Sequence, residues 1–141
     1  MRTDLPDVNV LVALFMANHE HHDQSHEWLS GTQGFATTPF TEAGLVRVLM
    51  TRTRATDPLP AAQALDRLRE LRGLACAVFW PDDTSLADRR AITAHLAAPR
   101  QVTDTHLLNL AIARGGRLVT FDRGIAAPVN ARSRRNVLEL A

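Results

Sequence analysis

The sequence predicts an α/β domain with a mostly parallel central sheet that is covered by helices on both faces. Short apolar segments of strand length alternate with longer amphipathic segments, which is typical of βαβ units. At 141 residues the chain has the length of one domain, and 45% of its residues are hydrophobic, so we expect residues 1–141 to fold as a single unit. In open parallel sheets, ligands bind beyond the carboxyl ends of the strands, where the strand order reverses. Acidic residues that follow predicted strands are therefore the first candidates for a functional site.

In the N-terminal half, two short strands are each followed by a helix. The helix after the second strand is expected to have Thr38 as its N-cap and Pro39 as its first residue, because proline is tolerated at that position. Leu45 and Leu49 recur with helical spacing, and Glu42 shares their inward-facing stripe. The expected elements are a strand at residues 5–8, a helix at 9–16, a helix at 23–29 with Trp28 and Leu29 facing inward, a strand at 35–38 and the helix that begins at 39.

In the C-terminal half, the same alternation continues. Residues 118–121 form the clearest buried strand, and Asp122 ends it. Gly73 and Pro81 end a helix and a strand respectively, because glycine favours helix C-termini and proline cannot continue a ladder. The expected elements are a helix at residues 61–72, a strand at 75–80, a helix from 85 to about 97, a helix at 104–114, a strand at 118–121 and an edge strand at 136–140.

The composition excludes several classes of function. All sixteen basic residues are arginine, whereas receiver domains, haloacid-dehalogenase-like phosphatases and P-loop enzymes each require a lysine at their site. The net charge of +1 shows no global basic field for nucleic acid. One cysteine, Cys76, allows no intramolecular disulfide, and no apolar run reaches the roughly 18 residues of a membrane span. No signal peptide pattern begins the chain, so we expect a cytoplasmic protein with no membrane contact.

Four carboxylates are expected at the same end of the sheet. Asp7 and Asp122 each end a predicted strand, while Glu42 and Asp104 lie in the opening turns of two predicted helices. Like charges that converge at short range repel one another unless a cation lies among them. Mg²⁺ prefers oxygen ligands, and in such a site it activates water and stabilises charge at a phosphodiester. The sequence therefore predicts a divalent metal site at this edge.

Four motifs in order resemble the PIN domain, and more narrowly the VapC-type toxins of bacterial toxin–antitoxin pairs. The motifs lie at residues 7–14, 38–47, 102–108 and 118–124. The resemblance implies a three-layer α/β/α fold and an endoribonuclease that depends on Mg²⁺ or Mn²⁺. It also implies a homodimer that is inhibited by a small VapB-type antitoxin. By motif, the catalytic and metal-binding residues are Asp7, Glu42, Asp104 and Asp122, and the residues that orient ligands or water are Asn9 and Thr120.

Each of these acidic residues also has an ordinary explanation when it is taken alone. Asp7 and Asp122 resemble turn residues, Glu42 complements a helix dipole, and Asp104 resembles a helix cap. The runner-up function is therefore a catalytically silent PIN-like module that binds a protein partner. No covalent mechanism is expected, because Cys76 belongs to an apolar segment and no serine lies in a recognisable nucleophile elbow.

Other polar residues suggest weaker hypotheses. Four histidines suggest a zinc site, namely His19, His21, His22 and His26. No cysteine or Glu-x-x-His partner accompanies them, so a solvated helix start is the favoured interpretation. The candidates for RNA contact are Arg47, Arg52 and Arg54, whereas Arg132, Arg134 and Arg135 are typical of a solvated loop. We further expect an apolar groove between the helices at residues 42–50 and 61–72 to receive an antitoxin segment.

Overall fold

A computed structural model describes residues 2–54, 56–91, 93, 96–122 and 135–140. Its strands form a five-stranded sheet in the order β3-β2-β1-β4-β5, in which every neighbouring pair is parallel. The chain adds β2 and β3 on one side of β1 and then β4 and β5 on the other side. The strand order therefore reverses between β1 and β4, and their carboxyl ends form the switch point. The strands are β1 (Asp4–Pro6), β2 (Phe35–Thr37), β3 (Ala77–Phe79), β4 (Arg117–Thr120) and β5 (Val137–Glu139).

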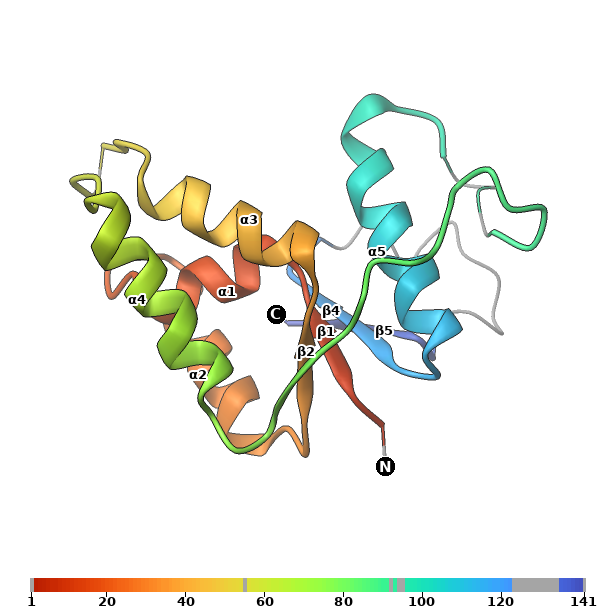
Figure 1. Ribbon diagram of the computed structural model, residues 1–141, viewed down its shortest axis with the longest axis horizontal. Coiled ribbons are helices and arrows are strands. Elements are labelled where there is room, and N and C mark those ends of the chain that lie inside the picture. The colour runs from red at the N-terminus through yellow and green to blue at the C-terminus, as the bar shows by residue number, and fades with distance from the viewer. Residues whose placement is uncertain (1, 55, 92, 94–95, 123–134, 141) are drawn as a thin grey trace.

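Helices cover both faces of the sheet, so the expected three-layer α/β/α architecture is confirmed. Figure 1 shows α1 to α4 on one side of the strands and α5 on the other. Alternate residues of β4 serve the two cores: Val119 packs with the first group of helices, while Leu118 packs against α5. The helices are α1 (Val8–Phe15), α2 (His22–Gly31), α3 (Pro39–Leu49), α4 (Ala61–Arg72) and α5 (Val102–Ala113), with a short 3₁₀ turn at Pro99–Gln101.

The first strand and helix begin one residue earlier than the sequence predicts. β1 ends at Pro6, and Asp7 caps α1 by accepting a hydrogen bond from the backbone N–H of Val10. The expected start of α3 is confirmed, because Thr38 is its cap and Pro39 its first residue. Most of the other boundaries shift by one or two residues, which is usual because helix and strand ends fray.

The helix predicted from residue 85 to about 97 does not form at residues 85–91, 93 and 96–97, and the remaining residues of that range lie outside the described part of the chain. Two side chains take the place of helical hydrogen bonds. The hydroxyl of Ser85 accepts from the N–H of Ala87, and the carboxylate of Asp88 accepts from the N–H of Arg90. Such local bonds offer the backbone an alternative to the helix, and this explains why the prediction was wrong.

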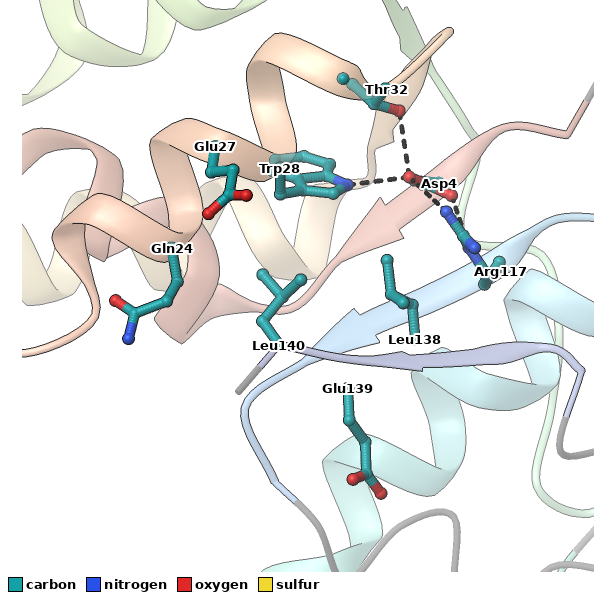
Figure 2. A pocket seen from close by; sticks show the side chains of 10 residues that line it. Asp4, Gln24, Glu27, Trp28, Thr32, Arg117, Leu138, Glu139 and Leu140 are labelled. Carbon is teal, nitrogen blue, oxygen red and sulfur yellow. Dashed lines mark hydrogen bonds and ion pairs between the residues drawn. The ribbon is translucent and has the colours of Figure 1, made fainter.

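A buried hydrogen-bond cluster anchors the amino end of the central strand β1. Asp4 is only 2% exposed, and Figure 2 shows three side chains from other elements pointing toward its carboxylate. Trp28 donates its indole N–H at 2.8 Å, and Thr32 donates its hydroxyl at 3.0 Å. Arg117 contributes two donors, Nε at 2.9 Å and Nη2 at 3.2 Å. These bonds tie β1 to α2 and β4, and thereby fix the strand that carries Asp7 at its other end.

Candidate functional site

Asp7 lies at the switch point, directly after β1. Its Oδ1 accepts from the N–H of Val10 at 3.0 Å, and its Oδ2 accepts from the hydroxyl of Thr120 at 2.7 Å. Its own N–H donates to the carbonyl of Val119 at 3.0 Å, so the backbone is fixed as well. Burial raises the pKa of Asp7, and the hydrogen bonds to its carboxylate oppose that rise only in part.

Two more aspartates converge on Asp7 from distant parts of the chain. Asp104 lies in the first turn of α5, and Asp122 follows β4 by two residues. Burial, together with the negative charges of Asp7 and Asp122, raises the pKa of Asp104 to about 6. The charge of Asp122 also raises the pKa of Asp7. Three segments that are far apart in sequence therefore place their carboxylates within electrostatic reach of one another.

Glu42 lies in the first turn of α3 but has partners of its own. Its Oε2 accepts from the hydroxyl of Thr37 at 2.7 Å and lies 3.6 Å from Nε of Arg72. The charges that raise the pKa of Asp104 are those of the other two aspartates. Glu42 therefore lies at the carboxyl end of β2, but an arginine from the end of α4 partly neutralises it.

The polar residues expected beside the carboxylates lie in different settings. Thr120 is fully buried and links two aspartates, because its hydroxyl donates to Asp7 and accepts from the N–H of Asp122 at 3.0 Å. Asn9 is exposed in the first turn of α1. Of these two residues, only Thr120 has a side chain that directly positions an acidic group in the structure.

The three arginines proposed for RNA contact lie in the last turn of α3 and in the loop after it. Arg47 is exposed in the last turn of α3. Arg52 lies beyond the end of that helix and forms an ion pair with Asp57 at 2.8 Å, and Arg54 is exposed in the same loop. Glu42 lies in the first turn of α3, whereas Arg52 and Arg54 follow the last turn of the same helix. The solvated arginines considered at positions 132 and 134 lie outside the described residues.

Comparison with known proteins identifies the fold family. The sequence pattern of the PIN domain matches residues 5–129. The chain belongs to the PIN-domain family. It is 43% identical over 136 residues to Ribonuclease VapC39 of Mycobacterium tuberculosis, covering 92% of this chain and 95% of that protein. It is also 45% identical over 123 residues to Ribonuclease VapC38, covering 86% of each chain, and 39% identical over 125 residues to Ribonuclease VapC44, covering 86% and 87%, both from the same organism.

The acidic edge of this PIN domain has the donor chemistry of a hard cation site. Its three aspartates provide oxygen atoms alone, and burial together with their mutual repulsion raises the pKa of Asp104 to about 6. Each bonded oxygen of Asp7 keeps a second lone pair for a ligand. Within the described residues, no three acidic, imidazole or thiolate groups yet stand close enough to ligate one ion together. The residues fit a divalent cation that would draw these carboxylates together.

Two histidines of the PIN domain bond carbonyl oxygens at the end of α1 through their side chains. The imidazole of His22 bonds the carbonyl of Ala13 at 2.7 Å, and that of His26 bonds the carbonyl of Leu14 at 2.9 Å. These carbonyls belong to the last turn of α1, which has no later residues to donate to them. The side chains of His22 and His26 therefore join α2 to the end of α1.

Sequence reasoning missed two residues whose side chains contact the carboxylate of Glu42. Thr37 ends β2, and a hydroxyl at the end of a strand is a signal that the sequence did carry. Arg72 is thirty positions away and also places its guanidinium 4.8 Å from the ring centre of Phe79. No local pattern connects Arg72 with Glu42, because their contact arises from the packing of α4 against α3.

Proposed function

We propose that this PIN domain is an endoribonuclease that depends on Mg²⁺ or Mn²⁺, and that it is the toxin of a toxin–antitoxin pair. The observation that carries the proposal is the convergence of Asp7, Asp104 and Asp122 at the switch point of the sheet, where burial and the charges of the other two aspartates raise the pKa of Asp104 to about 6. The similarity to proteins named ribonuclease supports RNA as the substrate. No described helix is both long and apolar enough to span a membrane, and we propose that the enzyme acts in the cytoplasm.

The proposed roles follow from the contacts of each side chain. A divalent ion supplies the positive charge that activates water and stabilises the phosphate during hydrolysis. Asp7, Asp104 and Asp122 hold this ion, and Thr120 keeps Asp7 in its orientation through the 2.7 Å hydrogen bond. Glu42 completes the acidic site from α3, and Asn9 orients water or ligands from α1. Cys76 is not a candidate nucleophile, because it precedes β3 and therefore lies at the amino end of the sheet, opposite the carboxylates.

RNA cleavage mapping tests this proposal directly. We expect the wild-type protein to cut total cellular RNA at defined positions, and we expect those cuts to disappear in Asp7→Asn. Asparagine retains the oxygen that caps α1, so the variant should fold while it loses a charge. Cleavage that persists in excess chelator would contradict the metal dependence. Undiminished cleavage by an Asp7→Asn/Asp104→Asn double variant would contradict the assigned site.

The same experiment distinguishes the nuclease from the alternative, a catalytically silent module that binds a protein partner. Such a module would leave RNA intact with every divalent ion tested, although it would still bind its protein partner. It would also give no reason for three aspartates to be kept close together at a cost in repulsion.

A groove between α3 and α4 supports the proposal of an antitoxin partner. It has a volume of about 770 Å³, and its apolar lining includes Val46, Leu65 and Leu68 together with Met50, which is 43% exposed. We propose that an apolar segment of a VapB-type antitoxin binds there, and that the toxin itself is a homodimer. Light scattering measures the second point, and a monomeric mass at micromolar concentration would contradict it.

Co-expression with the neighbouring small open reading frame tests the groove. The wild-type protein should form a stable complex with that product, and Leu65→Glu should weaken it because a charge would enter an apolar contact. Leu74→Glu is the matched control, because Leu74 is as exposed as Leu65 but lies outside the groove. Separate elution of the two wild-type proteins would contradict this partner.

A further inference from the structure

One large aromatic side chain is exposed in the first turn of α3, the turn that also carries Glu42. Phe40 lies in the first turn of α3, two residues before Glu42, and is 37% exposed. The neighbouring residue Thr41 is fully buried, so the backbone here is firmly packed while the phenyl ring projects outward. The first turn of α3 therefore presents an apolar ring as well as the carboxylate of Glu42.

A histidine on the opposite helix meets this ring. His106 lies on α5, two residues after Asp104, and its ring centre is 6.4 Å from that of Phe40 with an angle of 75° between the planes. Figure 1 shows α3 and α5 on opposite sides of the central strands. The edge-to-face pair therefore spans the space between the two helices that carry Glu42 and Asp104.

The loop after β3 fixes the orientation of the imidazole. Nε2 of His106 lies 2.7 Å from Oδ1 of Asp82, which follows β3 by three residues. Within the described chain, this is the bond that holds the ring, and it leaves Nδ1 of His106 for another partner. A carboxylate that binds one ring nitrogen in this way sets the direction in which the other nitrogen points.

We propose that Phe40 and His106 form the binding subsite for one nucleobase of the RNA, next to the carboxylates. Phe40 provides a face on which a base stacks, and His106 provides a hydrogen-bonding edge. Stacking on an aromatic side chain is the usual way in which proteins bind unpaired bases, since every base has a π face. This inference rests on the proposed cleavage of RNA and assigns the residues that place the substrate at the acidic edge.

The contact between His106 and Asp82 could also serve only to tie the loop after β3 to α5. A second contact between the same loop and helix allows this structural role to be tested apart from base binding. The next residue, Asp83, forms a parallel tie to the same helix through Nη2 of Arg114 at 2.9 Å. Arg114 lies just beyond the C-terminal end of α5, far along the helix from Asp104. Breaking this second tie loosens the same loop and leaves the pair of rings intact, so it is a matched control.

Binding of a fluorescent oligoribonucleotide tests the subsite. The probe is the shortest RNA that the wild-type protein cleaves, with 2-aminopurine placed in turn at each position around the cut. All variants are made in the Asp104→Asn protein, so that binding is measured without cleavage. Phe40→Leu retains an apolar side chain but removes the ring, and Phe40→Tyr restores a ring. Arg114→Ala is the control for the loop, and His21→Ala is the control for another ring contact, the stack of His21 on Phe121 at 4.2 Å.

We expect one position of the probe to be quenched on binding, and Phe40→Leu to abolish that quenching and weaken binding about tenfold. An abasic nucleotide at the same position should weaken binding to the parent protein by a similar factor. In Phe40→Leu, the abasic nucleotide should cause no further loss of affinity. Phe40→Tyr and Arg114→Ala should bind as tightly as the parent protein. His106→Ala should weaken binding to the natural base more than binding to the abasic RNA.

Two results would overturn the inference alone. In the first, the wild-type protein cleaves RNA, yet Phe40→Leu binds and quenches as the parent does. In the second, quenching is lost in His21→Ala instead, which would move the base to the other ring stack. A wild-type protein that neither cleaves nor binds RNA would contradict the proposed function and this inference with it.

Discussion

The raised pKa of Asp104 makes the stability of the fold depend on pH. Its pKa in the folded protein is raised to about 6 from an ordinary value of 3.8, chiefly by burial. Between these two pH values the folded protein therefore binds more protons than the unfolded chain. By linkage, the metal-free fold loses stability as pH rises from about 4 to about 6. The carboxylate is an unfavourable charge in the empty site and a useful one once a cation is present.

Replacing Asp104 with asparagine should remove this pH dependence. We expect metal-free Asp104→Asn to be at least as stable as the wild-type protein at pH 7, because burial and repulsion no longer act on a charge there. Thermal melts in chelator at pH 4, 5, 6 and 7 measure the effect. Asp88→Asn is the control, since Asp88 is exposed outside the site. Parallel pH profiles for wild type and Asp104→Asn would contradict the argument.

Asp4 is a residue whose importance the sequence did not reveal. Its carboxylate receives bonds from Trp28, Thr32 and Arg117 at the amino end of β1. We expect Asp4→Ala to destabilise the fold by roughly 3 kcal/mol, because it leaves a buried indole N–H and a partly buried guanidinium without their partner. Urea unfolding should show a lower midpoint with an unchanged slope.

The effect of Asp4→Ala should be confined to stability. At a temperature where the variant is still folded, its RNA cleavage should match the wild type, because Asp4 lies at the opposite end of β1 from Asp7. Asp66→Ala is a suitable control, since Asp66 is exposed and forms only a surface ion pair with Arg69. A midpoint equal to that of this control would show that the cluster contributes little.

At the scale of elements, the crossing of α1 and α3 places the acidic site. Gly44 of α3 lies against Val8, the first residue of α1, and a Cβ at position 44 would come within 2.5 Å of a Val8 methyl carbon. Val8 is β-branched and has little rotamer freedom in a helix, so it cannot easily turn aside. Since Asp7 directly precedes Val8, any shift of α1 also shifts the carboxylate.

We therefore expect Gly44→Ala to reduce stability by about 1–3 kcal/mol and to reduce cleavage even where the protein is folded. Gly31→Ala is the matched control in α2, because a Cβ there meets no atom within 4 Å. That control should be as stable as the wild type or slightly more so, since alanine favours helix over glycine. Equal unfolding midpoints for the two variants would show that α3 accommodates the methyl group by moving away.

At the scale of the whole molecule, the acidic site joins segments that are about one hundred residues apart. Asp7 follows the central strand, and Thr120 binds it from β4 across 113 positions of sequence. An ion held by Asp7, Asp104 and Asp122 would therefore stabilise the fold as a whole, because the unfolded chain cannot hold these groups together.

We expect Mg²⁺ or Mn²⁺ to raise the melting temperature of the wild-type protein, and chelator to reverse the rise. At one hundred times the dissociation constant, a ligand of the folded state adds about 2.7 kcal/mol to stability. Asp104→Asn should show a much smaller rise, and Asp88→Asn should respond as the wild type does. A melting temperature that is insensitive to both ions would contradict the metal site and favour the silent binding module.

Local patterns in the sequence determined the α/β class, the order of the strands along the chain and the start of α3 at Thr38-Pro39. They also placed Asp7 and Asp122 at the ends of strands. These features depend on hydrophobic periodicity and on capping residues, which act over a few neighbouring positions. The segment from residue 85 is the exception, because turns made by Ser85 and Asp88 replaced the helix that propensity favoured.

Only the tertiary structure decided which distant groups meet. It paired Glu42 with Arg72, buried Asp4 against Arg117, and brought His106 to Phe40 and Asp82. Each contact depends on which strands are neighbours in the sheet and on how two helices cross, and neither is encoded in the spacing of residues along one element. For the same reason, the three aspartates were individually ambiguous in the sequence, and the order β3-β2-β1-β4-β5 is what brings them to one edge.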